Sequence, residues 1–222
     1  ALAMMARAVG VEMHLAMPDS LTIERTLTMR ALGATVHLID GGMEQARDWV
    51  LAQVRDTAGR PDAFLMLNQF DNPDNARAHY ETTGPEVWRD TGGTVTHFVS
   101  AMGTTGTIMG VSRALKERNA AVRIIGCQPK AGEQIPGIRR WPTEYLPKIY
   151  EPARVDQVVD VGAQDAAAMA RTLAREHGLF SGHSTGGAAW AAVQTARALD
   201  QGVVVFIACD RGDRYLSSDL FC

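Results

Sequence analysis

Short apolar runs alternate along this chain with longer segments in which apolar residues recur every three or four positions. The apolar runs at 11–15, 35–39 and 64–67 predict three strands. Helical spacing follows the first two of these runs, at 20–32 and at 44–56, and Gly33 ends the first predicted helix. Strands that alternate with helices are typical of parallel sheets joined by right-handed crossovers, so the pattern predicts an α/β fold.

The second part of the chain repeats this alternation. Its predicted strands are 95–99, 122–128, 155–161 and 203–208, and its predicted helices are 84–91, 106–116, 166–176 and 186–199. The proline-rich segment at 129–150, which contains four prolines and two glycines, is expected to be a surface excursion with little regular structure.

The regular pattern breaks at residues 68–75, Asn-Gln-Phe-Asp-Asn-Pro-Asp-Asn, which is typical of a loop or a domain crossing. We therefore expect a smaller domain at 1–75 and a larger domain at 76–222. Each is expected to be a three-layer unit, with an open, twisted, mostly parallel sheet flanked by helices. The chain opens on Ala-Leu-Ala-Met-Met-Ala, a composition typical of the middle of a helix. We expect the first domain to be incomplete for that reason.

Composition narrows the classes of partner. The net charge of the 222 residues is −3 and no basic cluster is visible, so nucleic acid is not an expected partner. The apolar runs are far shorter than a membrane span. The cysteines at 127, 209 and 222 are too scattered for a disulfide framework or a zinc site. These features predict a cytoplasmic protein without a metal centre.

The segment Gly103-Thr104-Thr105-Gly106-Thr107 joins a predicted strand to a predicted helix. Such a turn directs backbone N–H groups and hydroxyls toward one point, and the helix dipole adds a favourable potential for an anion there. The segment therefore favours a bound phosphate group. The alternative interpretation is an ordinary turn in which the threonines cap the helix.

Five segments in order resemble the cysteine synthases, which are fold-type II pyridoxal phosphate (PLP) enzymes. The glycine and threonine loop is one of them, and the segments at 68–73 and 182–187 are two others. The segments at 135–142 and 209–217 are similar to the B-type subgroup of that family. The resemblance implies a cytoplasmic homodimer that carries out PLP-dependent β-replacement. Its substrates would be O-acetylserine with sulfide or thiosulfate, and its product L-cysteine or S-sulfocysteine.

The resemblance also implies roles in cofactor binding. It assigns the cofactor's 5′-phosphate to Gly103, Thr104, Thr105, Gly106 and Thr107, and the pyridine nitrogen to Ser184. A neutral hydroxyl has no charge that would stabilise a protonated pyridine, which suits β-replacement better than transamination. The alternative for Ser184 is a helix N-cap.

Four further residues are implied to contact substrates. Gln69 matches a glutamine that helps to bind the α-carboxylate, and Cys209 matches a cysteine near the site of B-type enzymes. Arg139 and Arg140 would favour an oxyanionic sulfur donor. The alternatives are a turn residue for Gln69, a buried small hydrophobic residue for Cys209, and solvated surface arginines packed over Trp141.

The family's Schiff-base lysine is implied to lie in a segment upstream of the position that Ala1 matches. The chain has lysines only at 116, 130 and 148, and none adjoins a pattern that would desolvate its amine. We therefore expect an N-terminally truncated chain that contains no catalytic residue and is inactive by itself. The alternatives are a catalytically inactive binding protein of the same fold, and a PLP-dependent serine/threonine dehydratase or cystathionine synthase.

Overall fold

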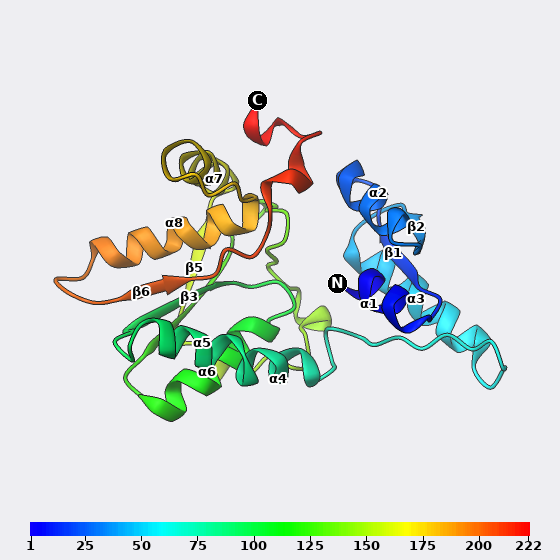
Figure 1. Ribbon diagram of the computed structural model, residues 1–222, viewed down its shortest axis with the longest axis horizontal. Helices are drawn as coiled ribbons and strands as arrows, with labels where there is room; N and C mark the ends of the chain where they lie inside the picture. Colours follow the sequence, from blue (N-terminus) through cyan, green and yellow to red (C-terminus); the bar gives the residue numbers. More distant parts are fainter. The chain divides into compact units, whose positions relative to one another are not determined.

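The computed structural model describes residues 1–222 as two compact units, which Figure 1 displays in sequence colours. The first unit contains residues 1–67 and 214–222, and the second contains residues 68–213. The division falls before the boundary expected at residue 75, and the last residues of the chain belong to the first unit. Side chains from the first unit bind this C-terminal segment: Thr22 Oγ1 donates to the Arg214 carbonyl at 2.6 Å, and Glu24 accepts from the Ser217 amide at 2.6 Å.

The first unit is built on a two-stranded parallel sheet. Strands β1 (His14–Pro18) and β2 (Thr35–Ile39) pair in parallel, and helices α1 (Leu2–Val9), α2 (Ile23–Ala31) and α3 (Met43–Thr57) complete the unit. The strand predicted at 64–67 is wrong, because that segment pairs with no other strand. Leu65 in it is 86% exposed, so neither ladder hydrogen bonds nor burial stabilise an extended segment there.

The second unit is built on a four-stranded parallel sheet in the order β5-β4-β3-β6. Its strands are β3 (His97–Ala101), β4 (Arg123–Pro129), β5 (Gln157–Val161) and β6 (Val204–Phe206). Its helices are α4 (Asp74–Glu81), α5 (Thr83–Asp90), α6 (Gly106–Arg118), α7 (Ala163–His177) and α8 (His183–Arg197). Helix α4 was not predicted, because the asparagines and the proline that precede it are typical of a loop. Proline is nevertheless compatible with the start of a helix.

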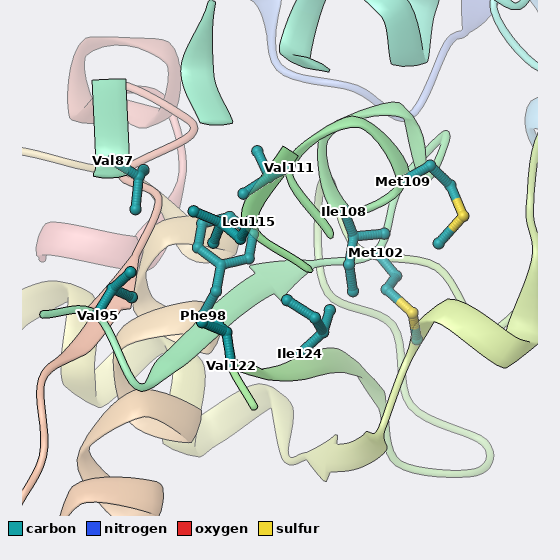
Figure 2. Close-up of a cluster of buried hydrophobic side chains, with 10 residues drawn as sticks. All are labelled: Val87, Val95, Phe98, Met102, Ile108, Met109, Val111, Leu115, Val122 and Ile124. Carbon is teal, nitrogen blue, oxygen red and sulfur yellow. The ribbon is translucent and has the colours of Figure 1, made fainter. Parts of the chain in front are cut away.

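The central strands β3 and β4 of the second unit are buried on both faces of the sheet. Phe98 and Ile124 point into a cluster with Leu115 of α6, which Figure 2 shows. Val99 and Ile125, the next residues on the same two strands, pack in a second cluster on the opposite face with α7 and α8. Successive strand residues alternate in this way between faces. Helices therefore cover both faces, with α4, α5 and α6 on one side and α7 and α8 on the other (Figure 1).

The parallel arrangement fixes where loops can meet. Strands β3 and β6 are neighbours and run in the same direction, so their carboxyl ends lie at the same edge of the sheet. The loop at 103–107 follows β3, and residues 209 and 210 follow β6. Ligands of open α/β sheets bind at this edge. None of the helices in either unit combines the length and the apolar stretch that a bilayer crossing requires.

Candidate active site

The glycine and threonine loop follows β3, as the sequence predicts, and its last two residues, Gly106 and Thr107, are the first residues of α6. Thr105 precedes α6 with a φ of 70°, in the left-handed region that is uncommon for a threonine. Its side chain makes no capping hydrogen bond to the helix. The Oγ1 atom of Thr105 is buried and has no hydrogen-bond partner within the protein. A buried hydroxyl without a partner is destabilising, so the helix-cap interpretation fails for Thr105 and the loop suits a ligand.

Helix α4 supports this loop from outside. Asn75 Nδ2 donates to Thr104 Oγ1 at 2.9 Å and to the Gln69 carbonyl at 2.7 Å. One turn later, His79 Nε2 lies 3.1 Å from Thr107 Oγ1, and burial lowers the pKa of the His79 imidazole. A Cβ atom at Gly106 would collide with the Asn75 side chain, so glycine is required where α4 approaches α6. The hydroxyls of Thr104 and Thr107 are thereby held in place by α4.

Residues 139–141 bind two carbonyls at the junction between β3 and the glycine and threonine loop. Trp141 Nε1 donates to the Gly103 carbonyl at 2.7 Å, and the Arg139 amide donates to the Met102 carbonyl at 2.8 Å. Phe70 packs edge-on against the Trp141 ring, with centroids 5.4 Å apart. A carbonyl directed at an anion would repel it, but these two carbonyls accept hydrogen bonds from Trp141 and Arg139. Sequence reasoning did not find this contact of Trp141, because it joins residues 38 positions apart.

Ser184 is the second residue of α8 and is buried. It does not serve as the N-cap, since that position belongs to Gly182. Its Oγ atom accepts a hydrogen bond from Cys209 Sγ at 3.4 Å. Its backbone N–H donates to Asp210 Oδ2 at 3.1 Å. The contact of Asp210 with α8 was not predicted, because nothing in its local sequence pattern signals it.

The loop and Ser184 meet at Gly137. The carbonyl oxygen of Gly137 lies 3.1 Å from the position that a Cβ atom of Gly103 would occupy. A Cβ atom on Gly137 would lie 3.0 Å from Ser184 Oγ, and the φ of Gly137 is 88°. Glycine is therefore favoured at 137 by both backbone conformation and space. The structure brings the predicted phosphate loop and the predicted ring contact together within the second unit.

The two arginines have different surroundings. Arg140 Nε donates to the Pro129 carbonyl at 2.9 Å, and its guanidinium also pairs with Asp160. Hydrogen bonds from Gln128 and then from Arg140 lower the pKa of the Asp160 carboxyl. Arg139 is half-buried, and its guanidinium makes no hydrogen bond or ion pair within the protein. Arg139 is therefore the arginine with its charge available to an anionic ligand.

Cys209 follows β6 and presents its sulfur to Ser184. The residue reaches solvent, yet the protein atoms around its sulfur desolvate it and raise the pKa of the thiol, against the opposing effect of the Ser184 hydrogen bond. A protonated thiol is an S–H donor, which matches the contact with Ser184 Oγ. The side chain of Gln69 is exposed and makes no hydrogen bond within the protein.

Each lysine of the chain pairs with an aspartate. Lys116 binds Asp156 at 2.8 Å, and Lys148 binds Asp71 at 3.2 Å. Lys130 lies 3.6 Å from a carboxylate oxygen of Asp165. The three amines are thus each paired with a carboxylate, and the expectation that none of them forms an imine stays a prediction.

The surroundings of Gly137 fit the chemical groups of PLP. The phosphate needs hydrogen-bond donors at a positive potential, which the start of α6 and the unpartnered Thr105 hydroxyl offer. The pyridine nitrogen needs a donor, which the Ser184 hydroxyl offers because its oxygen already accepts from Cys209. The absence of a Cβ atom at Gly137 leaves space beside Ser184.

Comparisons with known proteins agree with this interpretation. The family described as "Pyridoxal-phosphate dependent enzyme" matches residues 1–210. The chain is 55% identical to cysteine synthase B of Pseudomonas aeruginosa over its whole length, which covers 73% of that protein. It is 52% identical to cysteine synthase B of Escherichia coli, again over its whole length and 72% of that protein.

A solved structure is similar as well. The crystal structure of cysteine synthase (OASS) from Entamoeba histolytica superposes with a TM-score of 0.86 at 34% sequence identity. The match covers 99% of this chain and 67% of that protein. Fold, sequence and the composition of the site lead to the same assignment. The chain belongs to the family of pyridoxal-phosphate dependent enzymes.

Proposed function

We propose that this protein is a PLP-dependent transferase of cysteine biosynthesis. It replaces the acetoxy group on the β-carbon of O-acetylserine with sulfide or thiosulfate, releases acetate, and forms L-cysteine or S-sulfocysteine, respectively. One observation carries the proposal: Gly137 lies against both Gly103, in the loop that holds the unpartnered Thr105 hydroxyl, and Ser184, in a chain that is 55% identical to a cysteine synthase B.

The loop at 103–107 binds the cofactor phosphate. A dianion at the start of α6 is stabilised by the helix dipole and by backbone N–H groups. Thr105 Oγ1, which has no hydrogen-bond partner within the protein, donates a hydrogen bond to the phosphate. Asn75 and His79 hold the hydroxyls of Thr104 and Thr107, so the donors are positioned before the phosphate arrives.

Ser184 orients the cofactor ring. When bound, PLP supplies an aromatic system that withdraws electrons from the α-carbon of the amino-acid substrate. Cys209 donates its S–H to Ser184 Oγ, which leaves the Ser184 proton free to face the pyridine nitrogen. Because Ser184 is neutral, it does not stabilise a positive charge on that nitrogen. This moderate withdrawal favours loss of the β-substituent over transamination.

Gln69 binds the amino-acid substrate, and Arg139 binds the sulfur donor. The exposed amide of Gln69 binds the α-carboxylate of the amino acid. The unpaired guanidinium of Arg139 attracts an oxyanion, and thiosulfate carries oxygens that sulfide lacks. Arg140 contributes less to donor binding than Arg139, because its guanidinium already binds Asp160 and the Pro129 carbonyl.

A direct assay tests the proposed reaction. The full-length protein is supplied with PLP, O-acetylserine and either sulfide or thiosulfate, and cysteine and S-sulfocysteine are measured by mass spectrometry. Parallel reactions contain homocysteine, or contain serine or threonine alone. Acetate release with formation of either product supports the proposal. Cystathionine, pyruvate or 2-oxobutyrate as the main product would instead identify one of the related reactions, and no product with PLP bound would identify a binding protein.

We also propose that the protein is a homodimer and acts in the cytoplasm. The support is the resemblance to cysteine synthases and the scattered, free cysteines. Light scattering coupled to size-exclusion chromatography measures the mass of the full-length protein in solution. A mass equal to one chain would refute the dimer.

A further inference from the structure

Helix α8 begins without a capping side chain of its own. Its N-cap is Gly182, which has no side chain, and its second and third residues are Ser184 and Thr185. The N–H groups at these positions have no acceptor within the helix, and an N-cap side chain normally binds one of them. The start of α8 therefore depends on an acceptor from elsewhere in the chain.

Asp210, which follows β6, supplies this acceptor. Its Oδ1 atom accepts from the amides of Gly182 at 3.2 Å and Thr185 at 2.9 Å, and its Oδ2 atom accepts from the Ser184 amide at 3.1 Å. Its negative charge lies at the positive end of the helix dipole, where it is stabilising. One carboxylate thus binds three amides at the start of α8.

Thr185 makes this contact reciprocal. Its Oγ1 atom donates to Asp210 Oδ1 at 2.5 Å and accepts from the Asp210 amide at 3.2 Å. The backbone of residue 210 is therefore fixed relative to α8 together with its side chain. The preceding residue, Cys209, donates to Ser184 Oγ at 3.4 Å. Two consecutive residues after β6 thus hold both the backbone and the hydroxyl of Ser184.

We propose that Asp210 is a positioning residue for the cofactor ring, and that it acts by fixing Ser184 so that its hydroxyl faces the pyridine nitrogen. The inference rests on the proposed function, because it takes Ser184 as the contact of that nitrogen. Asp210 does not touch the cofactor in this account. Its carboxylate oxygens are occupied by the amides of α8 and by Thr185, so it binds no substrate either.

A double-mutant cycle between Asp210 and Ser184 tests the proposal. The full-length protein is prepared as wild type, Asp210→Ala, Ser184→Ala and the double variant. Asp213→Ala is the matched control, because Asp213 lies in the same segment and its carboxylate pairs with Arg211. Three quantities are measured: the dissociation constant of PLP by titration, the absorption spectrum of the bound cofactor, and thermal unfolding of the protein without PLP.

We expect Asp210→Ala to raise the dissociation constant of PLP about tenfold in the wild-type background, as the loss of one well-placed hydrogen bond does. In the Ser184→Ala background it raises this constant less than about twofold, because the contact through which it acts is gone. The absorption maximum shifts in both single variants and not further in the double variant. Asp213→Ala leaves the PLP affinity and the spectrum unchanged.

The outcomes separate this inference from the proposed function. Equal effects of Asp210→Ala in both backgrounds would show a general structural role and overturn the inference alone. If Ser184→Ala binds PLP like the wild type, Ser184 is not the ring contact, and both proposals fail. If Asp210→Ala does not fold, Asp210→Asn, which keeps one acceptor oxygen, replaces it in the cycle. Failure of both to fold would assign Asp210 to fold stability and overturn the inference.

Discussion

The substitution Thr105→Val tests two effects of one hydroxyl group: its effect on the stability of the protein without PLP, and its effect on the affinity for PLP. Valine keeps the shape and the β-branch of threonine, so the strain of the 70° φ angle is the same in both proteins. The substitution removes a hydroxyl that is buried and has no partner in the protein without ligand. An unsatisfied buried polar group destabilises a fold by about 1–3 kcal/mol.

We therefore expect Thr105→Val to stabilise the protein without PLP by about 1–2 kcal/mol. For a chain of this length the midpoint of thermal unfolding would rise by about 3–6 °C. The same change removes a hydrogen bond to a phosphate, which is worth about 1.5–3 kcal/mol, so the dissociation constant of PLP would rise by about 10- to 150-fold. Higher stability without PLP together with weaker binding of PLP would show that this hydroxyl serves the ligand and not the fold.

Thr107→Val is the matched control. The Oγ1 atom of Thr107 has a partner in His79 at 3.1 Å, so removal of this hydroxyl leaves an imidazole nitrogen without a partner. This variant should be less stable than the wild type without PLP. Thermal unfolding with and without PLP, together with PLP titration, measures all of these effects. A loss of stability in Thr105→Val without PLP, or an unchanged PLP affinity, would refute the reasoning.

Three further substitutions test other parts of the account. Arg139→Gln should raise the KM for thiosulfate at least fivefold and change the KM for sulfide little, because only thiosulfate has oxygens to bind; equal effects on both donors would contradict this role. Gly106→Ala should destabilise the protein by about 1–3 kcal/mol, and Asn75→Ala should relieve part of that loss in the double variant, as denaturant unfolding would measure. Burial acts to raise the pKa of Asp156, but hydrogen bonds from Lys116 and a backbone amide outweigh it, so the pKa is lowered. The ionised carboxylate therefore stabilises the fold at neutral pH, and this contribution is lost as the pH falls through the folded-state pKa. Asp156→Asn should therefore lower stability at pH 7 by about 1–2 kcal/mol and have a smaller effect in acid, and equal losses at both pH values would argue against it.

Local sequence predicted the parts of the site that depend on one segment. The loop at 103–107 is visible because glycine and threonine between a strand and a helix constrain the backbone by themselves. Ser184 was found through the resemblance of its segment to a known family. Cys209 was placed near the site by the same resemblance, but the contacts of Cys209 and Asp210 with Ser184 were not predicted, because they depend on the pairing of β6 with β3.

The errors in the predicted elements have a similar origin. The apolar run at 64–67 is compatible with a strand, but a strand also needs a neighbour, and the local sequence does not specify one. Helix α4 was missed because Asp74 follows a loop-like run, whereas packing of α4 against α6 stabilises the helix. The role of Arg140 toward substrate stays a prediction, and its ion pair with Asp160 could be seen only in the fold.

A crystal structure of the full-length protein with PLP tests the central claim most directly. The account predicts phosphate oxygens within hydrogen-bond distance of Thr105 Oγ1 and of the backbone amides at 104–107. It also predicts the pyridine nitrogen within hydrogen-bond distance of Ser184 Oγ, with the ring beside Gly137. A phosphate bound away from the start of α6, or a ring nitrogen that faces another residue, would contradict it.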